Sequence, residues 1–237
     1  MEAQVRIGSN RELTLRHAVL IYGDGQAAFA TLHEVQATKD EAPYLGPAQS
    51  LTTAFLRTLA TGLGTRISPE VLPENVLART PEMMVWWSRA QRRLMFFGGG
   101  SKEAERLNGR MYPHPALVFK VSERELFVRA LAGDWRPSPE TPLKTAPYWN
   151  VDAQGRVCLG SMRVPDTLGV DSIEGWGKGF FESEFTHPSG AVRLTNHPGG
   201  FVGLWNSIDG RQRPFPGKFL TDATQTLRQF VEADEER

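Results

Sequence analysis

The stretch that decides the fold is PYWNVDAQGRVCL, residues 147–159. It combines an extended entry, a turn at residues 153–155 and a short apolar run that contains Cys158, the only cysteine of the chain. Asn150 precedes Cys158 by eight residues, with the turn between them. Such a turn folds the chain back, so we expect the Asn150 amide and the Cys158 thiol to lie on the same surface.

A thiol beside a side-chain amide suits acyl transfer. Thiolate is both a good nucleophile and a good leaving group, so Cys158 can carry an acyl group as a thioester. When a nucleophile attacks that thioester, the carbonyl oxygen gains negative charge, which an N–H of Asn150 can stabilise. Each residue also has a plainer interpretation, Cys158 as a small buried hydrophobe and Asn150 as a turn residue. His187 is a candidate base for the thiol.

The segments before this stretch are predicted to form a β-hairpin, a helix and then two further hairpins. Residues 17–22 and 27–35 predict a β-hairpin, and the apolar spacing of residues 47–63 predicts a helix with Pro47 in its first turn. Residues 83–88 and 93–98 predict a second hairpin, and residues 116–122 and 125–130 a third. The pair Trp86-Trp87 should place one ring in the core and the other at the surface.

Around the stretch, prolines and two further helices complete the pattern. Residues 134–147 contain four prolines, which predicts an irregular segment rather than a strand. Residues 173–185 predict a helix, and residues 221–235 predict a charged C-terminal helix. The whole indicates an α+β fold, with an antiparallel β-meander backed by helices.

The stretch resembles the active-site segment of the ubiquitin-conjugating enzymes. In that family a His-Pro-Asn triplet precedes a Cys-Leu pair, with eight residues from asparagine to cysteine. The residues that match the pattern are Asn150, Val151, Gly155, Cys158 and Leu159. Tyr148-Trp149 stands in place of the family's His-Pro, so the resemblance implies that the hydroxyl of Tyr148 braces the local backbone.

Within that superfamily the chain is similar to the bacterial PRTRC system protein B. This resemblance implies a ubiquitin-conjugating-enzyme-like domain at residues 46–237, preceded by a β-hairpin extension at residues 1–45. It also implies a conjugating enzyme that carries a modifier on Cys158 and passes it to an amine. Its partners would be a ThiF-like activating enzyme, a ubiquitin-like modifier protein and a JAB-type metallopeptidase. The alternative is a catalytically silent scaffold or binding module for the same proteins.

Composition narrows the possible functions and cellular locations of the protein. The 237 residues include 27 basic and 27 acidic side chains, so there is no general attraction to nucleic acid or to an anionic membrane. No stretch approaches the roughly 18 apolar residues that span a bilayer, residues 1–16 lack a secretory signal, and one cysteine makes no internal disulfide. We therefore expect a cytoplasmic protein. The histidines show no metal spacing, and we expect no cofactor, because the activating enzyme consumes the ATP.

Overall fold

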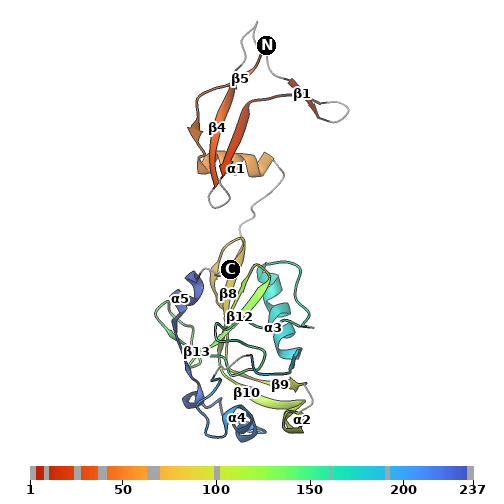
Figure 1. The fold of residues 1–237 in the computed structure, drawn as a ribbon, viewed down its shortest axis with the longest axis vertical. Helices are drawn as coiled ribbons and strands as arrows, with labels where there is room; N and C mark the ends of the chain where they lie inside the picture. The colour runs from red at the N-terminus through yellow and green to blue at the C-terminus, as the bar shows by residue number, and fades with distance from the viewer. Residues whose placement is uncertain are drawn as a thin grey trace. The chain divides into compact units, whose positions relative to one another are not determined.

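The computed structural model describes residues 4–7, 11–23, 28–36, 42–62, 70–98, 102–160, 162–189 and 193–233. The chain forms two compact units, Met1–Glu70 and Val71–Arg237 (Figure 1). The sequence predicted a boundary after residue 45, which would have joined the first helix to the second unit. In the structure this helix lies within the first unit, because the residues just before it pair with a strand there.

The first unit contains the predicted hairpin. β3 (His17–Gly23) and β4 (Ala28–Gln36) pair antiparallel, which confirms the hairpin; its turn, residues 24–27, lies outside the described residues. The helix α1 (Thr53–Gly62) begins later than Pro47, because β6 (Gln49–Ser50) pairs with β4. The Oγ1 of Thr52 then accepts a hydrogen bond from the N–H of Phe55 at 3.1 Å, as an N-terminal cap. The remaining strands are β1 (Gln4–Ile7), β2 (Arg11–Thr14) and β5 (Tyr44–Leu45).

The second unit is built on a six-stranded antiparallel sheet. Its strands run in the order β15 (Asp222–Thr226), β13 (Pro142–Thr145), β12 (Glu125–Ala130), β11 (Leu117–Ser122), β8 (Met83–Ser88) and β7 (Val76–Arg79). β11 and β12 pair antiparallel, which confirms the hairpin predicted for residues 116–122 and 125–130. The antiparallel sheets and the few helices confirm the predicted α+β class.

Three local predictions were wrong. β8 does not pair with β9 (Gln91–Phe97), because β9 leaves the main sheet to pair with β10 (Arg110–His114) and β14 (Glu184–Phe185). The proline-rich segment contains a strand, β13. Pro142 is its first residue, and a proline is tolerated there because no hydrogen bond in the interior of the strand is lost. The C-terminal helix shrinks to α5 (Leu227–Glu232), because the residues before it pair with β13 as β15.

Helices cover both faces of the main sheet. On one face, Trp86 and Phe119 pack with Phe180 of α3 (Ile173–Glu182), and on the other Trp87 packs in a separate cluster with Phe230 of α5. Figure 1 shows α3 and α5 on opposite sides of the strands β8 and β12. Both tryptophans are therefore buried, and the prediction of one exposed ring was wrong.

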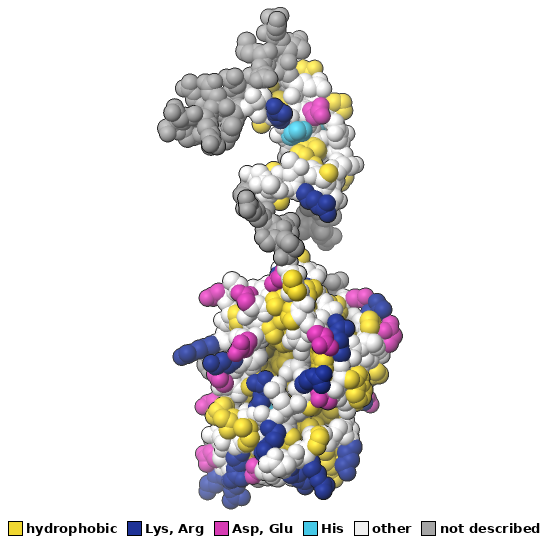
Figure 2. All heavy atoms as spheres, turned by 180° about the vertical axis from the view of Figure 1, so that it is seen from behind, with side chains coloured by type: hydrophobic (Ala, Val, Ile, Leu, Met, Phe, Trp, Pro, Cys, Tyr) yellow, Lys and Arg dark blue, Asp and Glu magenta, His cyan; other side chains and the backbone are white. Residues whose placement is uncertain are grey.

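Two helices were missed by the sequence analysis, α2 (Lys102–Leu107) and α4 (Gly200–Ile208). α4 contributes Leu204 and Trp205 to the core on the α3 side of the sheet. Two short 3-10 turns, Val170–Ser172 and Gly217–Phe219, complete the second unit. In the view of Figure 2, acidic and basic side chains are interspersed over much of this unit, in keeping with the zero net charge.

Candidate active site

The turn ahead of Cys158 is held by its own hydrogen bonds. Val151 and Val157 form an antiparallel bridge, and the N–H of Asp152 donates to the carbonyl of Arg156 at 3.0 Å. The Asp152 carboxylate accepts the N–H of Arg156 at 2.9 Å. Gly155 has φ = +88°, a conformation that glycine adopts without strain. The expected turn therefore exists, and it folds the chain back.

This turn packs directly on strand β12. The N–H of Val128 donates to the carbonyl of Gly155 at 2.7 Å, and the N–H of Val157 donates to Leu126 at 2.7 Å. A Cβ at position 155 would lie 2.8 Å from the Val128 carbonyl oxygen, closer than real Cβ contacts allow. Only glycine fits here, which ties the position of the thiol to the central sheet.

Cys158 lies at the surface. It is exposed, and with Leu159 and Ser189 it lines a hollow of about 440 Å³. The other lining side chains include Glu125 and Arg156, which form an ion pair. The sulfur therefore lies where a second molecule can reach it, and the surrounding hollow is polar as well as apolar.

Asn150 lies opposite Cys158 but turns its side chain to another segment. Its amide nitrogen Nδ2 donates to the carbonyl of Glu184 at 2.8 Å. Its Oδ1 accepts from the N–H of Thr186 at 3.1 Å, the Oγ1 of Thr186 at 3.1 Å and the N–H of His187 at 3.3 Å. The backbone N–H of Asn150 also donates to the carbonyl of His187 at 2.9 Å. Asn150 thus brackets the chain at residues 184–187.

The same contacts fix the conformation of Asn150. It has φ = +61°, which asparagine tolerates better than most side chains, and only 8% of the residue is exposed. Two backbone N–H groups point at Oδ1, so the orientation of the amide is determined. Nδ2 carries two hydrogens, and one of them bonds to Glu184. The predicted oxyanion donor would be the second hydrogen.

The hydrogen-bond network of Asn150 extends to the side chain of His187. The Thr186 hydroxyl has one hydrogen, which it donates to Asn150, and its oxygen lies 2.8 Å from Nδ1 of His187. With the hydroxyl hydrogen directed at Asn150, we assign Nδ1–H of His187 as the donor to the Thr186 oxygen, which makes Nε2 the acceptor nitrogen of the ring. His187 is exposed, and two residues later Ser189 lines the hollow beside Cys158. The sequence indicated His187 but not Thr186, whose partner Asn150 is 36 residues away.

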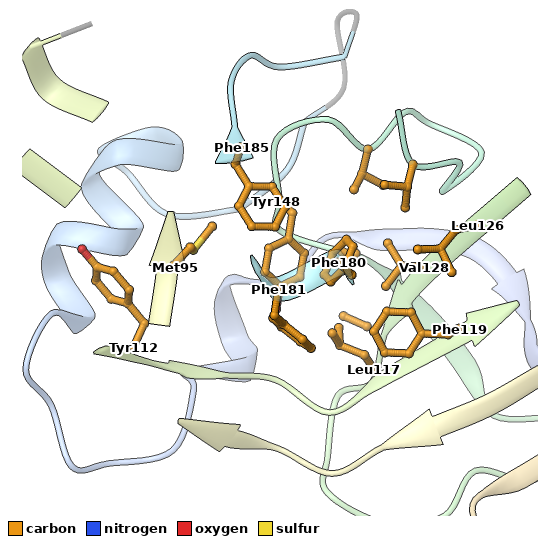
Figure 3. Packing of buried hydrophobic residues seen from close by; sticks show 14 of the residues in the cluster. Met95, Tyr112, Leu117, Phe119, Leu126, Val128, Tyr148, Phe180, Phe181 and Phe185 are labelled. Atoms are coloured by element: carbon orange, nitrogen blue, oxygen red, sulfur yellow. The ribbon is translucent and has the colours of Figure 1, made fainter. Parts of the chain in front are cut away.

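Tyr148 lies in the core rather than beside the thiol. Its hydroxyl lies 2.8 Å from Nδ1 of His114, and the two rings stack. Figure 3 shows Tyr148 among Phe180, Phe181 and Phe185, and the residue is fully buried. Burial raises the pKa of Tyr148 well above its ordinary value and lowers the pKa of His114 to about 3. Both side chains are therefore neutral, and their hydrogen bond attaches the start of the 147–159 stretch to the core.

Within the described ranges, no group of three His, Cys, Asp or Glu side chains is arranged to hold a metal ion. None of the helices in the same ranges has both the length and the apolar character that a membrane crossing requires.

One comparison with known proteins gives a match. The family model described as prokaryotic E2 family D matches residues 52–223, which is most of the chain and includes α1 and the whole candidate site. No curated protein and no solved structure matches the chain.

Proposed function

The chain belongs to prokaryotic E2 family D, and on this premise we propose that it is a ubiquitin-like-protein conjugating enzyme. The observation that carries the proposal is the exposed Cys158, opposite Asn150 on a turn held against the central sheet. Cys158 is the proposed nucleophile, Asn150 the proposed oxyanion donor, and Tyr148 a brace that acts through the core.

The proposed reaction has two steps. The Cys158 thiolate attacks the activated C-terminal carbonyl of the modifier. The bond between this carbonyl and its activating group breaks, the activating group leaves with the electron pair, and a thioester forms. The acceptor amine then attacks this thioester, an amide bond forms, the nitrogen loses a proton and the thiolate of Cys158 is released. Nδ2 of Asn150 would stabilise the oxyanion in the second step, and Nε2 of His187 would take the proton.

The proposed setting is a bacterial cassette of the PRTRC type, in which this chain corresponds to protein B. Its partners would be a ThiF-like activating enzyme and a ubiquitin-like modifier, with a JAB-type metallopeptidase in the same operon. We place the reaction in the cytoplasm. These assignments are proposed from the similarity of the sequence stretch at residues 147–159.

A specific observation favours a second candidate, a catalytically silent scaffold that binds the same proteins. The Asn150 amide already holds residues 184–187, and the Tyr148 hydroxyl already bonds to His114. Both side chains therefore have roles in the fold that require no chemistry. The exposed thiol favours the enzyme, because a cysteine whose only role is packing is usually buried.

Mixing the full chain with the activating enzyme, the modifier and ATP, followed by a non-reducing gel, tests the choice. Wild type should form an adduct that a thiol reductant removes. Cys158→Ser should form an adduct that resists the reductant, because an oxyester exchanges poorly with thiols, and Cys158→Ala should form none. Since Cys158 is exposed, the free energy of unfolding of both variants should lie within about 0.5 kcal/mol of the wild-type value. If wild type forms no reductant-sensitive adduct with all components present, the scaffold is the better answer.

A further inference from the structure

A second hollow lies on the other side of the active-site turn. It is a groove of about 860 Å³ between that turn and the C-terminal segment of β15 and α5, over strands β11 and β12. Its lining shares Glu125, Asp152 and Arg156 with the hollow beside Cys158. The two hollows therefore meet at the turn.

Arg129 of β12 lines this groove and is a buried cation without an ion pair. Only 4% of the residue is exposed. Its Nε donates to Oε1 of Gln225 at 3.3 Å, and its Nη1 has no hydrogen-bond partner. Among the described residues, no carboxylate lies within ion-pair distance of the guanidinium. A buried charge is unfavourable unless it is paired and hydrogen-bonded, so this arrangement is incomplete.

The other charged groups of the groove are already engaged. Glu125 pairs with Arg156, and the Asp152 carboxylate accepts the N–H of Arg156. Nζ of Lys120 donates to the carbonyl of Ala233. Burial lowers the pKa of Arg129 and the charge of Asp152 opposes that shift, but arginine remains protonated in proteins. Asp152 thus acts on Arg129 through its charge alone, and no described side chain serves as a direct ion partner of the guanidinium.

We propose that the groove binds a ligand that carries a carboxylate group, with the Arg129 guanidinium as its ion partner. The guanidinium carries a single positive charge, which one carboxylate neutralises, whereas a phosphate dianion brings one negative charge too many. The planar guanidinium fork matches a carboxylate, and the amides of Gln225 and Gln229 supply neighbouring hydrogen-bonding groups.

The proposed site borders the active-site turn. Gly155 packs against the guanidinium, since a Cβ at this position would be 3.2 Å from both Cζ and Nε of Arg129. Nη1 has almost no accessible surface, so a ligand reaches it only when neighbouring atoms move. We therefore expect the amide of Gly155 to report binding.

Titration of the ¹⁵N-labelled full chain with sodium acetate, against sodium chloride at equal ionic strength, tests the proposal by NMR. The Nε–H signal of Arg129 and the amide signal of Gly155 should shift saturably with acetate and not with chloride. Arg129→Gln should weaken acetate binding at least tenfold, because a charged hydrogen bond is lost. Arg213→Gln, an exposed arginine outside the groove, should bind like wild type.

Several outcomes overturn the proposal. They are equal shifts with acetate and chloride, unchanged binding in Arg129→Gln, or tighter binding of inorganic phosphate than of acetate. If Arg129→Gln does not fold, Arg129→Lys replaces it, and the wild-type titration still decides. No thioester is involved, so the result is independent of the proposed conjugating activity.

Discussion

Asn150 and Cys158 lie opposite each other on the active-site turn, and the carbonyl oxygen of Asn150 accepts the N–H of Cys158 at 2.7 Å. The Asn150 side chain, in contrast, bonds to residues 184–187. One residue therefore joins the thiol-bearing turn to a segment more than thirty positions further along the chain. Any effect of substituting Asn150 combines this structural bracket with the proposed chemistry.

Asn150→Ala should destabilise the fold by about 2–4 kcal/mol. It leaves the N–H groups of Thr186 and His187 without their acceptor, and alanine is strained at positive φ. If Nδ2 also stabilises the oxyanion, discharge of the preloaded thioester to free lysine should slow by about 10²–10³. Urea unfolding and single-turnover discharge measure the two effects.

Asn150→Asp separates the structural effect from the proposed chemical one. Aspartate keeps an acceptor at the Oδ1 position and tolerates positive φ, but its second oxygen replaces the Nδ2 donor and faces the Glu184 carbonyl. The N–H groups of Thr186 and His187 should stay bonded, so the loss of stability comes from the Glu184 contact, whereas discharge should slow by a similar factor. Discharge at the wild-type rate in folded Asn150→Asp would show that Asn150 has a structural role only.

His187→Asn should reduce discharge by about 10²–10⁴ if Nε2 acts as the base. Single-turnover discharge of the preloaded thioester to free lysine measures the rate. Thr186→Val removes the acceptor of Nδ1–H and should have an intermediate effect. Discharge at the wild-type rate in folded His187→Asn argues against this role.

Tyr148→Phe should cost about 1–3 kcal/mol of stability, because a buried nitrogen of His114 loses its partner. Discharge by the folded variant should stay at the wild-type rate, since the hydroxyl contacts the core. Tyr112→Phe is the matched control, as another fully buried tyrosine whose hydroxyl donates to the carbonyl of Leu107 at 3.0 Å. Slower discharge in Tyr148→Phe but not in Tyr112→Phe would indicate that the hydroxyl braces the site directly.

Stability should fall on acidification because of His114. Burial lowers its pKa from 6.5 to about 3 in the folded state, whereas the unfolded chain takes up the proton near the ordinary value. The contribution is therefore complete above about pH 6.5 and is lost as the pH falls toward 3, by up to about 1.4 kcal/mol per pH unit.

Urea unfolding between about pH 8 and pH 4 measures this dependence. His114→Gln should make the stability depend less on pH over this range, because glutamine takes up no proton. NMR titration of wild type provides a check that needs no variant. An imidazole of His114 that protonates near its ordinary pKa in the folded protein would contradict the expectation.

Gly155→Ala should be more harmful than Gly160→Ala. Both glycines have positive φ, +88° and +46°, so alanine adds about 1–2 kcal/mol of backbone strain at each. At position 155 the Cβ also meets the Val128 carbonyl at 2.8 Å, whereas at position 160 nothing lies within 4 Å. The clash should add about 1–3 kcal/mol, measured by urea unfolding. Equal losses would mean that the turn lifts away from β12 easily.

Several features of this protein followed from local sequence. The turn between Asn150 and Cys158 and the β3–β4 hairpin each depend on residues close together in the chain, and both formed as expected. Asn150 adopts the positive φ for which its short polar side chain is suited. The resemblance that pointed to a ubiquitin-conjugating family also depends on spacing within a single short segment.

Tertiary structure alone decided the contacts between distant segments. A strand pattern states that Met83–Ser88 and Gln91–Phe97 are extended, but not that they pair in different sheets. Likewise, nothing local links Asn150 to Thr186, Tyr148 to His114 or Arg129 to Gln225. These pairs form because burial removes water from polar groups and each must then find a partner wherever the fold brings one. Local spacing thus determined the shape of the active-site turn, whereas packing determined which side chains support it.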